Sequence, residues 1–89
     1  MKSVITVMGK DSVGIIAQVS SFLAENDINI IDISQTTHED KFLMVMVVDM
    51  EMSKIEFNDA VNGLKALGEK LGQRIQVRNK AVFDSMHRI

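Results

Sequence analysis

Apolar positions recur along this chain in two patterns, one typical of helices and one typical of strands. Two stretches have the helical pattern, in which residues three or four positions apart share one face. The first face consists of Ile15, Val19, Phe22 and Leu23. The second consists of Phe57, Val61, Leu64, Leu67 and Leu71. The spacing therefore predicts two amphipathic helices.

The residues that flank these stretches suit helix ends. Ser12 is the predicted N-cap of the first helix, and the Asn-Asp pair at 26–27 is its predicted stop. Ser53 and Glu56 have the spacing of a capping box before the second helix. Gly72 suits the C-terminal end of that helix, because glycine readily adopts the left-handed conformation found there.

Four further segments read as strands, at 2–8, 28–37, 42–50 and 74–80. The order β-α-β-β-α-β predicts an α+β, ferredoxin-like sandwich. Its four-stranded antiparallel sheet has two helices on one face, with the first and third strands in the middle. The tail residues Val82, Phe83, Met86 and Ile89 are spaced for a short amphipathic turn or C-terminal helix.

The third strand is apolar on both of its sides. Met44, Met46, Val48 and Met50 point one way, and Leu43, Val45 and Val47 point the other. Because the helices cover one face only, the other face should expose apolar surface, which usually marks an interaction site. We expect a homo-oligomer. The alternative is a monomer whose tail covers this face.

The two edge strands differ in their protection. The strand at 28–37 has no lysine and no proline, so its edge is open to pairing with a second copy. A dimer through this strand or through the open sheet face is therefore predicted. Arg74, Arg78 and Lys80 line the other edge strand, where a solvated, protected edge is favoured over attraction of an anion.

Composition narrows the classes of function. The 89 residues fit one domain, 1–89. A net charge of −2 and the absence of Trp and Tyr argue against nucleic-acid binding. No apolar stretch is long enough for a membrane span, and no signal-peptide core is present, so a cytoplasmic location is expected. The absence of cysteine excludes disulfides and thiol chemistry. Adjacent His38, Glu39 and Asp40 point different ways, so no metal site is expected.

The turn at 9–14 is the candidate binding site. It joins the end of a strand to the start of a helix, where free N–H groups and a partial positive charge suit carboxylates and phosphates. Gly14 would let a ligand or a neighbouring backbone approach closely. Glycine in such a turn also has a purely geometric explanation, and that alternative stays open.

The segments Asp-Ser-Val-Gly-Ile at 11–15 and Asn-Asp-Ile-Asn-Ile at 26–30 resemble the ACT domain. Nearly the whole chain takes part in the resemblance, and it is similar to stand-alone ACT proteins and to the ACT repeats of the glycine-cleavage-system repressor. Val13 stands where the family often has proline.

The resemblance implies a regulatory module that binds a small molecule, an amino acid in particular, near the first turn of one copy and the second strand of another. Asp11 would accept hydrogen bonds from the ammonium group of the amino acid. Backbone N–H groups and the Asn29 amide would donate hydrogen bonds to its carboxylate. The ligand-binding residues that it implies are Asp11, Ser12, Val13, Gly14, Ile15, Asn29 and Ile30. Helix capping by Asp11 and an edge hydrogen bond by Asn29 are the structural alternatives.

No enzyme and no cofactor is expected. Acylphosphatases of this topology need an arginine in the first loop, and here that loop has Lys10. No catalytic triad or paired carboxylates stand out. Regulation would act in trans on an unknown protein partner. The remaining alternative is a protein–protein interaction module of the same fold that binds no small ligand.

Overall fold

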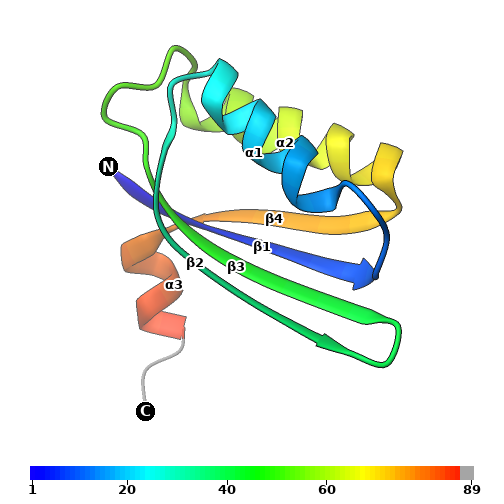
Figure 1. The fold of residues 1–89 in the computed structure, drawn as a ribbon. Coiled ribbons are helices and arrows are strands. Elements are labelled where there is room, and N and C mark those ends of the chain that lie inside the picture. The colour runs from blue at the N-terminus through cyan, green and yellow to red at the C-terminus, as the bar shows by residue number, and fades with distance from the viewer. Residues whose placement is uncertain (87–89) are drawn as a thin grey trace.

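The computed structural model describes residues 1–86 and has two main layers. The elements are β1 (Lys2–Lys10), α1 (Ile15–Glu25), β2 (Asn29–His38), β3 (Lys41–Asp49), α2 (Phe57–Leu71), β4 (Gln73–Asn79) and α3 (Lys80–Met86). Helices α1 and α2 lie side by side on one face of the sheet, and α3 lies on the opposite side (Figure 1). No helix among the described residues is long and apolar enough to cross a membrane.

The sheet has the order β2-β3-β1-β4, and every neighbouring pair is antiparallel. The ferredoxin-like βαββαβ fold is therefore confirmed, with β1 and β3 in the middle. Each predicted strand is displaced or extended by at most two residues. The β2–β3 pairing shifts register between Ile30 and Asp32, which marks a bulge in the edge strand.

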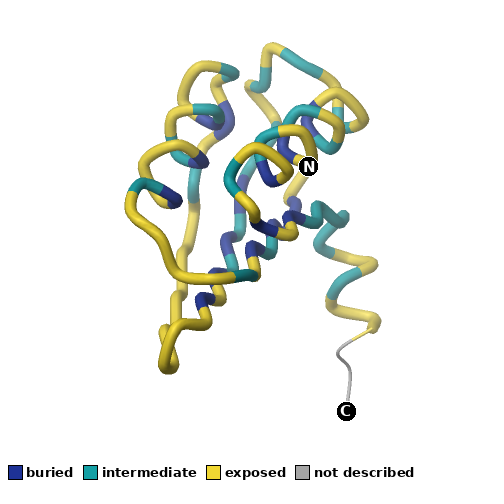
Figure 2. Tube along the Cα trace, turned by 90° about the vertical axis from the view of Figure 1, so that its right-hand side faces the viewer, coloured by how far each residue is buried: buried dark blue, intermediate teal, exposed yellow. Residues whose placement is uncertain are grey.

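The core lies between the sheet and the two helices. Strands β1 and β3 contribute Ile5, Val7, Phe42, Met44, Met46 and Val48. The helices contribute Ile15, Val19 and Leu23 from α1 with Ala60 and Leu64 from α2. Figure 2 shows the buried positions gathered on the inner sides of these elements, while β2 is exposed along nearly all of its length. The helices therefore cover the middle of the sheet and leave the β2 edge open.

The face away from α1 and α2 is only partly covered. Helix α3 contacts β1 and β4, and Val4 on this face is buried. Met8 and Leu43 remain 49% and 41% exposed near the other end of the strands. Among residues 1–86, the tail therefore does not cover the whole face. The predicted tail position Ile89 lies outside the described residues.

The predicted caps of both helices were wrong. Helix α1 starts at Ile15, so Ser12 is too early in the chain, and Gly14 is the N-cap with no side-chain hydrogen bond. The N-cap of α2 is Glu56, also without one. Ser53 instead closes the preceding turn: its hydroxyl accepts a hydrogen bond from the Ile55 N–H (3.1 Å) and donates one to the Ile55 carbonyl oxygen (2.7 Å).

Lys80 was also misplaced, because β4 ends at Asn79 and Lys80 begins α3. Its Nζ lies 2.6 Å from the Asp84 carboxylate, one helical turn further on. This ion pair within α3 removes Lys80 from the polar side of the edge strand. The predicted stops of α1 near Asn26 and of α2 at Gly72 are confirmed.

Candidate functional site

The loop between β1 and α1 ends in a left-handed glycine. Gly14 has φ 92°, and its carbonyl oxygen accepts the first hydrogen bond of the helix, from the Gln18 N–H at 3.0 Å. Because no side chain of residues 1–86 caps this end of α1, the first N–H groups of the helix are open to an outside acceptor. Carboxylates and phosphates are the groups that such an end favours.

Two hydrogen bonds hold this loop against the sheet. The Asp11 N–H donates to the Asp40 carbonyl oxygen at 2.7 Å, which ties the loop to the β2–β3 hairpin. The Gln73 side-chain Nε2 donates to the Lys10 carbonyl oxygen at 2.6 Å, which ties it to the start of β4. The loop that follows β1 is therefore held by the β2–β3 hairpin on one side of that strand and by β4 on the other.

Gln73 is a residue that the sequence patterns missed. Its side chain is 7% exposed, and its Oε1 has no hydrogen-bond partner among the described residues. It pairs with Gly9 across the β1–β4 ladder, and a Cβ added at Gly9 would lie 2.6 Å from Oε1. Gly9 thus makes room for the amide. The pairing register between two distant strands creates this contact, so no local motif indicates it.

The predicted residues at the loop differ in what they can offer a ligand. The side chains of Asp11, Ser12 and Val13 are exposed, and Val13 fully so. Ile15 is buried in the core, which leaves its backbone N–H as the group that faces outward at the helix end. The charged and polar candidates of the loop are therefore Asp11 and Ser12.

Asn29 and Ile30 lie at the other end of the sheet from this loop. Asn29 pairs with Asp49, which pairs with Lys2, whereas the loop follows Lys10. The nine residues of β1 separate these two ends by about 26 Å. One chain therefore does not bring the seven predicted residues together. Asn29 and Ile30 instead line a hollow of about 620 Å³ beside the end of α1.

A second hollow, of about 750 Å³, lies where β1 meets the β2–β3 hairpin. Met8 and Leu43 supply apolar surface, and Lys10, His38 and Lys41 supply basic groups. Among the described residues, no group of three His, Cys, Asp or Glu side chains is placed to hold a metal ion. The second histidine of the chain, His87, lies outside this range.

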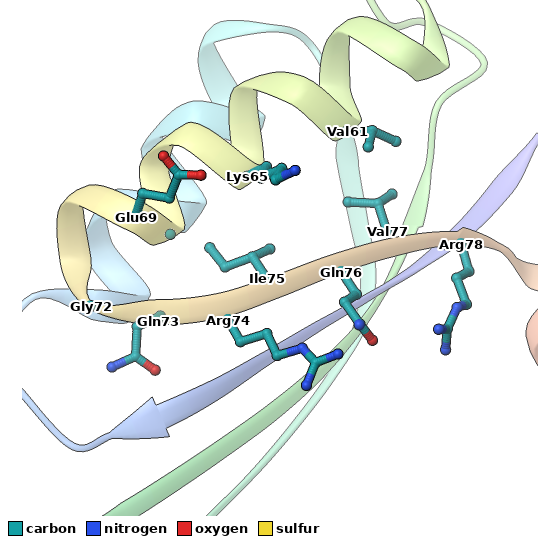
Figure 3. Close-up of a pocket in the computed structure, with 11 residues that line it drawn as sticks. Val61, Lys65, Glu69, Gly72, Gln73, Arg74, Ile75, Gln76, Val77 and Arg78 are labelled. Atoms are coloured by element: carbon teal, nitrogen blue, oxygen red, sulfur yellow. The ribbon is translucent and has the colours of Figure 1, made fainter.

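A third hollow, of about 690 Å³, runs between α2 and β4. Figure 3 shows Val61, Lys65 and Glu69 on the helix above the strand, with Ile75 and Val77 pointing up toward them. Arg74, Gln76 and Arg78 point to the other side of β4. Those three residues also line this hollow, which therefore extends to both sides of the edge strand.

Comparison with known proteins gives a consistent result. A family model of the ACT domain matches residues 3–78. A UPF0237 protein from Clostridium acetobutylicum is 48% identical over 89 residues, which is the whole of both chains. An ACT domain protein from Streptococcus pneumoniae has a structure with a TM-score of 0.82, at 42% identity over 94% of each chain.

A solved structure of a candidate glycine cleavage system transcriptional repressor shares the fold, with a TM-score of 0.72. The match has 23% identity and covers 86% of this chain and 44% of that one. The resemblance drawn from the two sequence segments, to stand-alone ACT proteins and to the glycine-cleavage-system repressor, is therefore confirmed.

Proposed function

Since this chain belongs to the ACT domain family, a family of regulatory, ligand-binding modules, we propose that it binds an amino acid between two copies and regulates a separate protein in the cytoplasm. The ligand site would consist of the β1–α1 loop of one copy and the start of β2 of the other. The observation that carries this proposal is the separation of the two groups of predicted residues by about 26 Å in one chain.

Pairing of two β2 edges would remove this separation. In a symmetric antiparallel pair, the start of one β2 lies beside the end of the other. The end of β2 at His38 leads directly to Asp40, whose carbonyl oxygen holds the Asp11 N–H. Asn29 of one copy would therefore come close to the Asp11 loop of its partner. The ligand would bridge the two copies.

The polar groups of the β1–α1 loop and of the start of β2 match the charges of an amino acid. The uncapped N–H groups at Gly14 and Ile15 suit its carboxylate, and the exposed Asp11 carboxylate suits its ammonium group. Asn29 offers both a donor and an acceptor from the second copy. Ser12, Val13 and Ile30 would shape the site around the ligand side chain.

The β2 edge has the properties that such pairing needs. Ile31 and Ile33 are 46% and 43% exposed, and the strand carries neither lysine nor proline. Edges that are meant to stay unpaired usually carry such residues. The exposed Met8 and Leu43 on the open sheet face favour a second candidate function, an interaction module that pairs through this face and binds no small ligand.

A thermal-shift screen of the protein against the twenty amino acids and common nucleotides tests the proposal. A ligand at 100 times its dissociation constant stabilises the native state by about 2.7 kcal/mol, which raises the Tm of so small a domain by roughly 10 °C or more. A rise with one amino acid, larger at higher protein concentration, supports the bridging site. No rise with any compound would favour the interaction module.

A further inference from the structure

The outer edge of β4 is the other open edge of the sheet. Within the described residues, β4 pairs with β1 on one side and has no neighbouring strand on the other. An edge of this kind presents backbone N–H and C=O groups that another extended chain can use. The hollow between α2 and β4 follows this edge for the whole run from Gln73 to Arg78.

The charges along this edge differ in sign from the chain as a whole. Lys65, Arg74 and Arg78 line the hollow together with a single acidic residue, Glu69. None of the three cations forms a salt bridge with another residue in the range 1–86. The edge is therefore net positive and unneutralised, in a chain whose formal net charge is −2.

The two sides of β4 favour different side chains in a strand added beside it. Ile75 and Val77 face α2 beside Val61, so this side of the edge is apolar (Figure 3). Arg74 and Arg78 face the other side and are four residues apart. A strand added here would place its side chains alternately toward the apolar side and toward the arginines.

A second copy of this chain does not suit this edge. If two β4 strands paired antiparallel about Gln76, Arg74 of each copy would lie opposite Arg78 of the other. Like charges directly opposite one another destabilise a pair of strands, whereas opposite charges stabilise it. In this register the edge therefore disfavours a second copy of β4 and favours an acidic strand.

We propose that the β4 edge docks an extended acidic segment of another protein, which adds to the sheet as a fifth strand. The segment carries acidic residues four positions apart, opposite Arg74 and Arg78, and apolar residues next to each of them on the inner side, opposite Ile75 and Val77. This surface goes beyond the ligand site, because it lies on the edge strand opposite β2 and gives regulation in trans a place of contact.

The test uses the full chain and a fluorescein-labelled peptide, Ser-Glu-Val-Thr-Val-Glu-Ser, with binding followed by fluorescence anisotropy. We expect saturable binding that weakens by at least about tenfold in an Arg74→Glu/Arg78→Glu variant. A peptide with lysine in place of both glutamates should bind that variant and not the original protein. Circular dichroism and Tm of the variant check that its fold is kept.

Two controls separate strand addition from plain charge attraction. A peptide with N-methylated backbone amides at both valines keeps its charge but loses the donors, so it should not bind. Equal binding of the methylated peptide, or tighter binding of a single-stranded oligonucleotide, would overturn the proposal. So would peptide binding unaffected by the double substitution. Because no amino acid is added, these outcomes are independent of the ligand site at the β1–α1 loop.

Discussion

The side-chain amide of Gln73 donates a 2.6 Å hydrogen bond to the carbonyl oxygen of Lys10, the last residue of β1. The bond joins residues 63 positions apart and lies at the base of the loop that carries Asp11 and Gly14. Gln73 is buried, whereas Lys10 lies at the surface of the protein. This contact therefore positions the candidate ligand loop, and it connects that loop to the start of β4.

Replacing Gln73 by methionine should lower the free energy of unfolding by about 0.5–1.5 kcal/mol, because the Lys10 carbonyl oxygen loses a part-buried hydrogen bond. Urea denaturation measures the change. Gln76→Met is the matched control, since Gln76 lies on the same strand with no side-chain hydrogen bond to the loop. An equal loss of unfolding free energy in both variants would mean that the hydrogen bond to Lys10 does not stabilise the fold.

Gly9 and Gln73 should be energetically coupled. A Cβ at position 9 would lie 2.6 Å from Gln73 Oε1, so Gly9→Ala forces the buried amide to move and should cost on the order of 1–3 kcal/mol. In a Gln73→Ser background the space is free, and the same substitution should cost much less. A double-mutant cycle by urea denaturation measures the difference. Additive losses would contradict the contact.

Gly14→Ala separates strain from ligand binding. Position 14 has φ 92° with only Gln18 Nε2 near, at 4.0 Å, so alanine meets backbone strain rather than a clash; the left-handed region costs it roughly 1–2 kcal/mol. Gly72→Ala is the matched control, with φ 69° and nothing within 4 Å. Both variants should lose similar stability, but only Gly14→Ala should weaken the thermal response to the ligand. A full response in Gly14→Ala would place the site elsewhere.

The two candidate dimer surfaces give opposite expectations for two lysine substitutions. Ile33→Lys puts a charge on the open β2 edge, and Leu43→Lys puts one on the open sheet face; both positions are more than 40% exposed. If the copies pair through β2, Ile33→Lys should yield monomers and Leu43→Lys should not. Sedimentation velocity measures the outcome. The reverse pattern would assign the interface to the sheet face.

The sequence patterns predicted the fold well because the relevant signals are local. Alternation along the strands placed all four of them to within two residues of their observed bounds, and helical spacing from Ile15 and from Phe57 located helices α1 and α2. The caps failed because Ser12 and Ser53 have the right chemistry but precede the helix starts by three and four residues. A cap depends on where the turn ends, which Gly14 decides through its left-handed backbone.

The site was predicted less fully, for a physical reason. The loop residues follow one another in the chain, so the motif at 11–15 located them together. Gln73 reaches the loop only through the register of β1 with β4, and no local pattern contains that register. The distance between Asn29 and Asp11 likewise depends on the antiparallel arrangement of β1, β3 and β2. Both features can be located only when the arrangement of the strands in the sheet is known.

The most direct test of the shared site is complementation between two defective variants. Asp11→Ala and Asn29→Ala should each abolish the ligand response alone, since each damages every site of its own dimer. In a mixed dimer, one site would contain Asp11 from one copy and Asn29 from the other, and both would be intact. Calorimetric titration of an equal mixture, after unfolding and refolding together, should recover about one quarter of the original sites. No recovery, with mixed dimers shown to form, would contradict a site built from two copies.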